Sequence, residues 1–295
     1  MPETPPVCSY EGSDYQTSFW EQGDRAYEDA AEAVALKRLL PASGAHLLEL
    51  GAGAGRNTPR YAGYQHITLV DYSHTQLEQA RDRLGVNDHY TYVAADIYRL
   101  PFVDGLFDGA TMIRTLHHMA DAPRALAQVR RVLQPGATFI LEYANKRNLK
   151  AMLRYLLRRQ DWSPYSPEPV EFAALNFDFH PVTVRAWLKT AGFTLQRQLT
   201  VSHYRMAIFK KLIPLPLLVW MDSLAQLTGD LWQLSPSVFT RSQAAGSSPL
   251  AAPGTRFACP ACATPMADTP PELTCPACKR TYPAVDGIYD LRLTN

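Results

Sequence analysis

The sequence lacks an uninterrupted apolar run long enough to cross a bilayer. Its most apolar stretch, LIPLPLLVWM at residues 212–221, is far shorter than the roughly 20 residues that a membrane-spanning helix needs, and it contains two prolines. The first residues, MPETPPVCSYEG, lack the basic segment and apolar run of a secretory signal peptide. We therefore expect a cytoplasmic protein with no transmembrane segment.

The chain also lacks a strong excess of either charge. Its 29 Lys and Arg and 28 Asp and Glu residues give a formal net charge of +1. This balance argues against nucleic-acid binding through the overall field of the protein, although local basic patches can still bind nucleic acid. A length of 295 residues with 46% hydrophobic content suits one large core with a small second unit.

Cysteine is scarce, and four of the five cysteines occur in two identical CPAC segments. Cys259, Cys262, Cys275 and Cys278 have the spacing C-x2-C-x12-C-x2-C, which lets two tight knuckles present four thiolates to one tetrahedral zinc ion. Four sulfur ligands leave no position open for water, so we predict a structural zinc site that supplies much of the folding energy of a short tail. Cys8 is expected to be a free thiol.

Short β-favouring runs alternate with helical patterns between residues 46 and 144. The runs are HLLEL, HITLVD, YTYVAAD, FDGATMI and TFILEYA. This alternation predicts a parallel sheet with helices on both faces. EDAAEAVALKRLLP predicts a leading helix before the sheet, and TLQRQLTVS and PSVFTRSQ are candidates for later strands.

Composition divides the chain into four parts. We assign residues 1–45 to an N-terminal segment with the leading helix and residues 46–240 to the sheet domain. Residues 241–255, RSQAAGSSPLAAPGT, are rich in Ser, Ala, Gly and Pro and predict a flexible linker. Residues 256–295, which contain the cysteines, are then expected to form a separate module.

The segment LLELGAGAGR places Glu49, Gly51, Gly53 and Gly55 between a predicted strand and a predicted helix. Glycines at such a turn let the backbone approach a ligand closely, and the following helix offers unpaired N–H groups to an anion. A nucleotide-type ligand is the natural interpretation. The dinucleotide fingerprint G-x-G-x-x-G would need a glycine where Arg56 stands, which weakens the interpretation as an NAD site.

Residues 46–143 resemble the class I S-adenosylmethionine-dependent methyltransferases of the UbiE-like, or methyltransferase type 11, group. Besides the glycine loop, the resemblance rests on VDYSHTQLEQAR, AADIYRLPF and FDGATMIRTLHHMADAPRALAQVRRVLQPGATFIL, although Ala137 replaces the second glycine of the family's L-x-P-G-G turn. It implies a doubly wound, Rossmann-like α/β fold and an enzyme that binds S-adenosyl-L-methionine. The implied cofactor-binding residues are Glu49, Gly51, Gly53, Gly55, Asp71, Tyr72, Asp96 and Ile97, with Asp71 on the ribose, Asp96 beside the adenine amine and Ile97 against the ring.

Three residues after the fourth predicted strand are candidates for the chemistry of methyl transfer. His117 or His118 could act as a general base for an acceptor that carries a proton, or merely pack or hydrogen-bond. Arg114 could orient an anionic substrate or pair with a carboxylate. The N-terminal run YQTSFWEQGDRAY either closes over the cofactor or packs against the leading helix.

Two further segments bear on the substrate. KRNLKAMLRYLLRRQ has leucines on one helical face, six basic residues and no acidic residue, which suits RNA, an anionic membrane or a solvated surface. The stretch of about residues 205–232 falls where the resemblance places the last strand hairpin, and it predicts a helical insertion rich in Leu, Met and Trp. This insertion could be a lid for an apolar substrate, ordinary core or a docking surface for the tail.

The tail FACPACATPMADTPPELTCPACKRTYPAVDGIYDLR resembles the Trm112-like zinc-ribbon family. That resemblance implies an accessory role, either stabilising the enzyme or docking its substrate. We expect a small-molecule substrate and keep RNA or protein substrates, peripheral membrane contact and a non-catalytic cofactor-binding scaffold as alternatives. The oligomeric state is left open.

Overall fold

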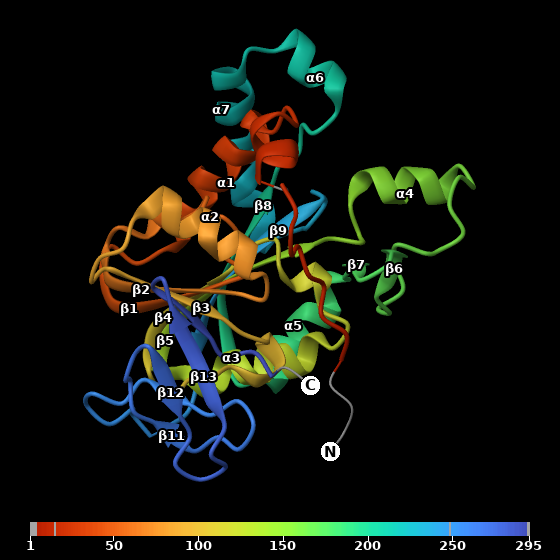
Figure 1. Ribbon diagram of the computed structural model, residues 1–295. Helices are drawn as coiled ribbons and strands as arrows, with labels where there is room; N and C mark the ends of the chain where they lie inside the picture. Colours follow the sequence, from red (N-terminus) through yellow and green to blue (C-terminus); the bar gives the residue numbers. More distant parts are fainter. Residues whose placement is uncertain (1–4, 15, 248, 294–295) are drawn as a thin grey trace.

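A ten-stranded sheet forms the centre of the computed structural model, which describes residues 5–14, 16–247 and 249–293 (Figure 1). The strand order is β12-β13-β14-β3-β2-β1-β4-β5-β9-β8. Five parallel strands carry the predicted runs: β1 (Gly44–Leu50), β2 (Tyr64–Asp71), β3 (Tyr90–Ala94), β4 (Phe107–Met112) and β5 (Leu133–Ala144). The two later predicted strands are β8 (Phe193–Val201) and β9 (Ser237–Ala244), and β9 runs antiparallel to both β5 and β8.

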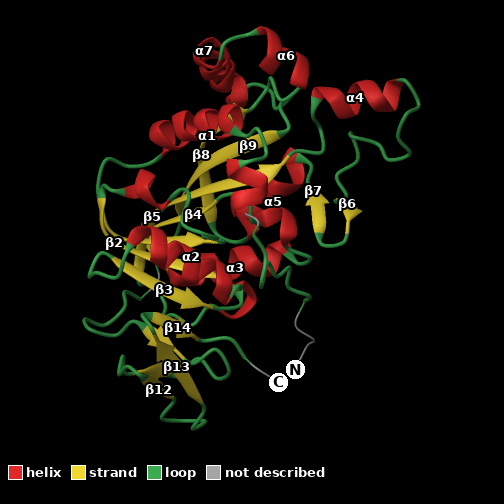
Figure 2. Cartoon of the chain, turned by 45° about the horizontal axis from the view of Figure 1, so that its top comes forward, coloured by secondary structure: helices red, strands yellow, loops and turns green. Residues whose placement is uncertain are grey.

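Helices cover both faces of this sheet, as the alternating pattern predicts (Figure 2). α1 (Ala26–Leu39) and α2 (His74–Leu84) pack into the buried cluster on one face, and α3 (Ala122–Val132) and α5 (Pro181–Thr190) pack into the cluster on the other. Neighbouring residues of β1 show why: Leu47 joins the first cluster and Leu48 the second, because successive side chains of a strand point to opposite faces. The doubly wound, Rossmann-like fold is confirmed.

The predicted insertion between β8 and β9 is helical. It contains α6 (Ala207–Leu212), α7 (Leu215–Ala225) and the 3-10 turn η5 (Gln226–Asp230). α7 packs against α1, where the buried Asp222 carboxylate accepts a hydrogen bond from the Tyr27 hydroxyl at 3.0 Å. None of the helices in the described ranges has both the length and the apolarity needed to span a membrane.

A second excursion leaves the sheet after β5. It consists of α4 (Leu149–Leu156) and the small hairpin β6 (Val170–Ala173) and β7 (Asn176–Asp178). Asn148 caps α4 by accepting a hydrogen bond from the backbone N–H of Ala151. α4 projects from the molecule, and Ala151 is its one buried residue (Figure 1).

The tail is not the separate module that the composition predicts. It forms the short strands β10 (Phe257–Ala258), β11 (Pro265–Met266), β12 (Glu272–Thr274), β13 (Thr281–Val285) and β14 (Ile288–Asp290). β14 pairs in parallel with β3, with Ile288 opposite Tyr92, so the tail extends the central sheet. Phe257 is fully buried and stacks on Phe102 with 6.0 Å between ring centroids.

The predicted linker is also shorter than its composition suggests. Residues 241–244 belong to β9, and Ala244 is buried opposite Phe193. Beyond them the Ala251 N–H donates a hydrogen bond to the Gly105 carbonyl, which ties the connecting segment to the sheet domain. The predicted linker begins too early because serine and alanine are small enough to continue a buried strand. Composition alone does not reveal that a neighbouring strand pairs with these residues.

Candidate cofactor site and four-cysteine cluster

A cavity opens at the carboxyl ends of β1, β2 and β4. Eight of the predicted site residues line it: Glu49, Gly51, Gly53, Asp71, Tyr72, Ile97, Arg114 and His118. Three predicted residues, Gly55, Asp96 and His117, are not part of its lining. The carboxyl ends of parallel strands are where open α/β sheets bind ligands, so the location agrees with the predicted cofactor site.

The glycine loop contains one position, Gly51, where only glycine fits. Its φ is +65°, and a Cβ added there would lie 2.1 Å from the Thr115 hydroxyl oxygen. Gly53 also has a positive φ, and its backbone N–H donates a hydrogen bond to the Asp71 carboxylate at 2.9 Å. The two residues bring bare backbone against the cavity and join the loop to the end of β2.

The acidic residues around the cavity are held in different ways. Asp71 also accepts from the Ser73 N–H at 2.9 Å, and burial raises the pKa of its carboxyl. Asp96 follows β3, accepts from the Tyr98 N–H at 2.8 Å and has its pKa raised by burial. Glu49 is buried, receives the Thr58 hydroxyl hydrogen at 2.6 Å, and burial raises its pKa to about 8. Burial therefore favours the protonated form of the Glu49 carboxyl.

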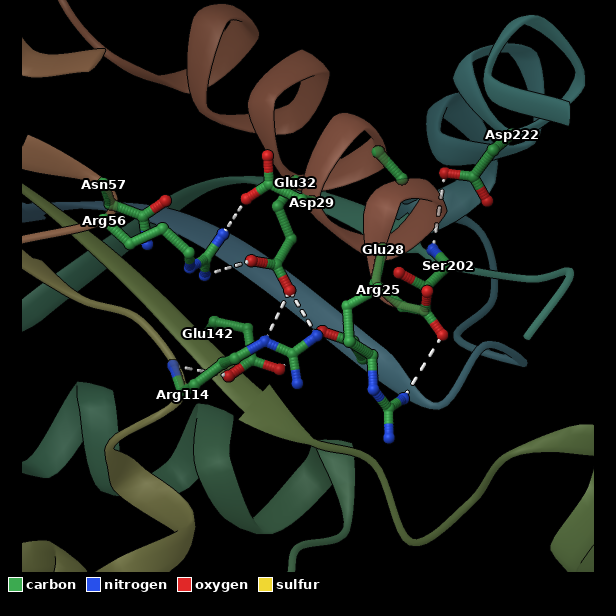
Figure 3. A network of polar contacts seen from close by, with 12 residues as sticks. Arg25, Glu28, Asp29, Glu32, Arg56, Asn57, Arg114, Glu142, Ser202 and Asp222 are labelled. Atoms are coloured by element: carbon green, nitrogen blue, oxygen red, sulfur yellow. Dashed lines mark hydrogen bonds and ion pairs between the residues drawn. The ribbon is translucent and has the colours of Figure 1, made fainter. Parts of the chain in front are cut away.

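A buried carboxylate on α1 connects two walls of the cavity (Figure 3). Glu32 pairs with Arg56 at the end of the glycine loop at 2.8 Å and also with Arg114 after β4. Burial alone would raise the pKa of Glu32, but the charges of Arg114 and Arg56 outweigh it and lower the pKa. Arg114, whose φ is +54°, thus pairs with a carboxylate, and its backbone N–H donates to Glu142 at 2.9 Å.

The two candidate histidines have different surroundings. The imidazole of His118 lines the cavity, where Nε2 lies 3.2 Å from the Tyr10 hydroxyl and Nδ1 lies 3.1 Å from the Leu175 carbonyl oxygen. A carbonyl can only accept, so Nδ1 carries the hydrogen and Nε2 is the free base. Burial lowers the pKa of His118, which favours the neutral form of its imidazole.

His117 is placed differently from His118. Its ring packs beside that of His118, with 4.0 Å between centroids, and it lies outside the cavity lining. Burial and the neighbouring His118 and Arg114 hold the pKa of His117 well below its usual range. Because His118 lines the cavity and His117 does not, a base role suits His118 and a packing role suits His117.

The N-terminal segment supplies part of the cavity wall. Trp20 lines the cavity, and the Arg56 guanidinium lies 3.5 Å from the centroid of its ring. Tyr27, from the same predicted run, is instead buried against α7, and Tyr15 lies outside the described residues. The sequence did not point to Val7, Cys8 and Tyr10, which also line the cavity, because they come from irregular chain without periodicity or motif.

The helical insertion does not cover this cavity in the described structure. No residue of 205–232 belongs to the lining, so the prediction of a lid is not supported. The insertion also lies at the opposite end of the molecule from the tail, which excludes it as a docking surface for the tail (Figure 1). Leu218 and Asp222 join the core, and most of the remaining apolar side chains are exposed.

The four CPAC cysteines converge as their spacing predicts. All four sulfur atoms lie within 4.8 Å of one another, with Cys259 and Cys278 at 3.6 Å and Cys262 and Cys275 at 3.5 Å. Thiolates on a tetrahedral zinc ion, with Zn–S bonds of about 2.3 Å, are separated by about 3.8 Å. The cluster therefore fits zinc, with every coordination position filled by sulfur.

The last residues of the tail reach the rim of the cavity. The Arg292 guanidinium donates a hydrogen bond to the carbonyl of Tyr72 at 3.1 Å and pairs with Glu11 at 3.3 Å. Glu11 in turn accepts from the backbone N–H groups of His74 and Thr75 at the start of α2. The tail thus supports the chain at the end of β2, which includes Asp71 and Tyr72.

Residues 48–141 match the family model described as a methyltransferase domain. The chain is 35% identical over 144 residues to an O-methyltransferase, cnsE, of Penicillium expansum, covering 44% of this chain and 51% of that protein. It is 27% identical over 168 residues to the demethylmenaquinone methyltransferase of Clavibacter sepedonicus, covering 53% and 69%. The chain thus spans about half to two thirds of the length of these relatives.

Solved structures agree on the fold. A chain of the complex between the Haloferax volcanii Trm112 methyltransferase activator and a methyltransferase superimposes with a TM-score of 0.55 at 16% identity, covering 79% of this chain and 96% of that chain. An S-adenosylmethionine-dependent methyltransferase from Mesorhizobium loti gives 0.52 at 18% identity, covering 74% and 100%. These structures agree with the Rossmann-like fold, and residues 48–141, which match the methyltransferase domain model, include the carboxyl ends of the strands at which the cavity opens.

Proposed function

We propose that the protein transfers a methyl group from S-adenosyl-L-methionine to a small, apolar molecule. The observation that carries the proposal is the cavity itself, where bare backbone at Gly51 and Gly53 meets the carboxylate of Asp71 inside the region that matches a methyltransferase domain. Ile113 and Met119 give the wall near His118 an apolar character, which supports an apolar acceptor. The demethylmenaquinone methyltransferase of Clavibacter sepedonicus, which is named for a small molecule, supports the same class of acceptor.

S-adenosylmethionine would supply a methyl group activated by its sulfonium centre. Gly51 and Gly53 allow close approach of the ligand, Asp71 is placed to accept hydrogen bonds from ribose hydroxyls, and Ile97 offers an apolar surface to the adenine. Asp96 lies outside the cavity lining, so we assign it the role of capping the turn that presents Ile97. The wall that Glu32 braces through Arg56 and Arg114 keeps these groups in position.

His118 is the proposed general base. Its Nε2 lone pair accepts the hydrogen of the Tyr10 hydroxyl at present, and a protic acceptor would take the place of Tyr10. The acceptor oxygen would form a bond to the methyl carbon as the carbon–sulfur bond breaks, and its proton would pass to Nε2 of His118. A neutral imidazole suits this role because only the free base can accept a proton.

We assign the four-cysteine cluster to a structural zinc ion and the tail to stabilisation of the sheet edge. The proposed location is the cytoplasm, where a reducing environment keeps thiolates available for metal binding. The competing proposal keeps the same cavity for methyl transfer but makes RNA or protein the substrate. In that case the tail and the basic helix would dock the substrate.

The test uses purified protein, methyl-labelled S-adenosylmethionine and a host-cell extract separated into RNA, protein and organic fractions. We expect label in the organic fraction, which disappears with Gly51→Ala and persists with Gly254→Ala, because Gly254 has a positive φ but nothing within 4 Å of an added Cβ. Label in RNA or protein would contradict the small-molecule acceptor. Cofactor binding without label in any fraction would favour a scaffold, and no binding would exclude the enzyme.

His118→Gln tests the base separately. We expect kcat to fall by about 10²- to 10⁴-fold with unchanged cofactor affinity, while His117→Gln has a much smaller effect. An equal loss in both variants would contradict the assignment.

A further inference from the structure

Two helical segments expose far more apolar surface than the core of this protein requires. In the α4 segment, Leu149, Leu153, Leu156 and Leu157 are all exposed, and Leu156 reaches 77%. In the insertion, Met206, Ile208, Leu212, Leu217, Trp220 and Leu224 are exposed, with Leu212 at 75% and Trp220 at 59%. α7 is rich in apolar residues, yet only Leu218 and Asp222 are buried, so most of its apolar side chains face solvent.

The helices that carry these side chains lie toward one end of the molecule. Figures 1 and 2 both place α4, α6 and α7 at the end opposite the tail. The backbone N–H of Leu149 donates to the Leu234 carbonyl at 2.9 Å, which joins the start of α4 to the segment after η5. We call the exposed apolar and basic side chains of residues 149–159 and 206–224 the end surface.

The charge of the end surface has one sign. Lys150, Arg154, Arg158, Arg159 and Lys211 are exposed, and none of them forms an ion pair with any described residue. Residues 146–160 contain no acidic side chain. The acidic residue of α7, Asp222, is buried and bonded to Tyr27 and His203.

We propose that the end surface binds peripherally to a membrane that contains anionic lipids. Leucine and tryptophan side chains enter the boundary between headgroups and acyl chains, and lysine and arginine side chains near them attract lipid phosphates. Clustered exposed apolar side chains mark interaction surfaces, whereas single exposed ones, such as Val86, are ordinary on a protein surface.

Other occupants fit the observations less well. RNA would use the basic side chains but would leave the exposed leucines and Trp220 in water. A second copy of the chain would cover the leucines but would bring unpaired cations of like sign close together. Membrane binding uses both components at once. It goes beyond the proposed methyl transfer, because it can be measured without cofactor or acceptor.

The experiment is co-sedimentation of the full chain with phosphatidylcholine vesicles that contain or lack phosphatidylglycerol. We expect binding to the anionic vesicles, weaker binding to the neutral ones, and loss of affinity at high salt. Leu153→Glu with Leu156→Glu should reduce affinity by at least about tenfold, because each buried leucine contributes on the order of that factor. Val86→Glu is the matched control, since Val86 is 69% exposed but lies beside Gly287 of the tail.

Charge is tested with Lys150→Gln and Arg154→Gln together, for which we expect at least about a tenfold loss on anionic vesicles. Lys37→Gln with Lys189→Gln is the matched control, because both lysines are exposed elsewhere. Absence of binding to anionic vesicles, or equal losses in variants and controls, would overturn the proposal. Two other results would also overturn the proposal. One is a dimer that dissociates in the leucine variant while vesicle binding is absent. The other is RNA binding that is weakened in the charge variant and unchanged in the leucine variant.

Discussion

The two ends of the molecule treat apolar side chains in opposite ways. At the β3 edge, the tail buries Phe257 against Phe102 and continues the sheet through β14. At the other end, the insertion and α4 expose Leu156, Leu212 and Trp220 to solvent. Both segments are additions to the parallel strands that carry the cavity. The difference indicates that the tail serves the stability of the fold and that the end surface serves an interaction outside the chain.

The largest expected effect comes from removing the metal ligands of the tail. Cys275→Ser with Cys278→Ser should abolish zinc binding, unfold the tail and expose the β3 edge, because structural zinc sites contribute on the order of 10 kcal/mol to folding. Zinc content and the melting temperature are the measurements. Cys8→Ser, which leaves the cluster intact, is the control. An unchanged melting temperature in the double variant would contradict the conclusion that the tail, unlike the end surface, stabilises the fold.

Phe257→Ala tests the same edge without touching the cluster. Truncation of a fully buried phenylalanine should cost about 3–5 kcal/mol in the free energy of unfolding. Phe172→Ala is the matched control, since Phe172 is 59% exposed and should change stability by less than about 0.5 kcal/mol. Similar losses in the two variants would show that the tail does not share the core.

Arg292→Ala asks whether the tail also supports the cavity. Losing its hydrogen bond to Tyr72 and its pair with Glu11 should weaken S-adenosylmethionine binding by about tenfold, or 1.4 kcal/mol, with a smaller loss of stability. Isothermal titration calorimetry measures the affinity. Arg280→Ala, an exposed arginine elsewhere on the tail, should leave it unchanged. Equal affinities of the wild type and Arg292→Ala would confine the tail to stability.

The smallest effect is expected at the end surface. Leu212→Ser should change the free energy of unfolding by less than about 0.5 kcal/mol, because the side chain is exposed before and after folding. Chemical denaturation measures it, and Leu218→Ser, at a buried position of α7, is the contrasting variant that should be strongly destabilising. A large loss with Leu212→Ser would mean that both ends are structural.

The parts of the fold that the sequence predicts are those with a repeating local pattern. The runs that become β1 to β5 are apolar over several residues and are separated by turn signals, so the apolar runs and the turns between them identify the strands. β14 has only three residues, and its partner β3 lies far away in sequence, so neither a period nor composition indicates the pairing. For this reason the predicted linker begins too early, within β9, and the predicted separate tail module instead joins the central sheet.

The site shows the same division. The glycine turn after a predicted strand indicates Gly51, and the family resemblance implies Asp71; both residues line the cavity. Val7 and Tyr10 reach the cavity through irregular chain, and only the tertiary structure brings them there. Whether His117 or His118 faces the cavity depends on the turn that follows Arg114, whose positive φ no pattern predicts.

The pairing of β14 with β3 also bears on how the protein is made. The two strands are separated by about 200 residues, so the outer edge of β3 emerges from the ribosome long before its partner exists. Until then, its N–H and C=O groups and the Phe102 ring stay available to other chains. Loss of the proposed zinc site would prolong this exposure, because the tail that carries β14 also carries the four cysteines.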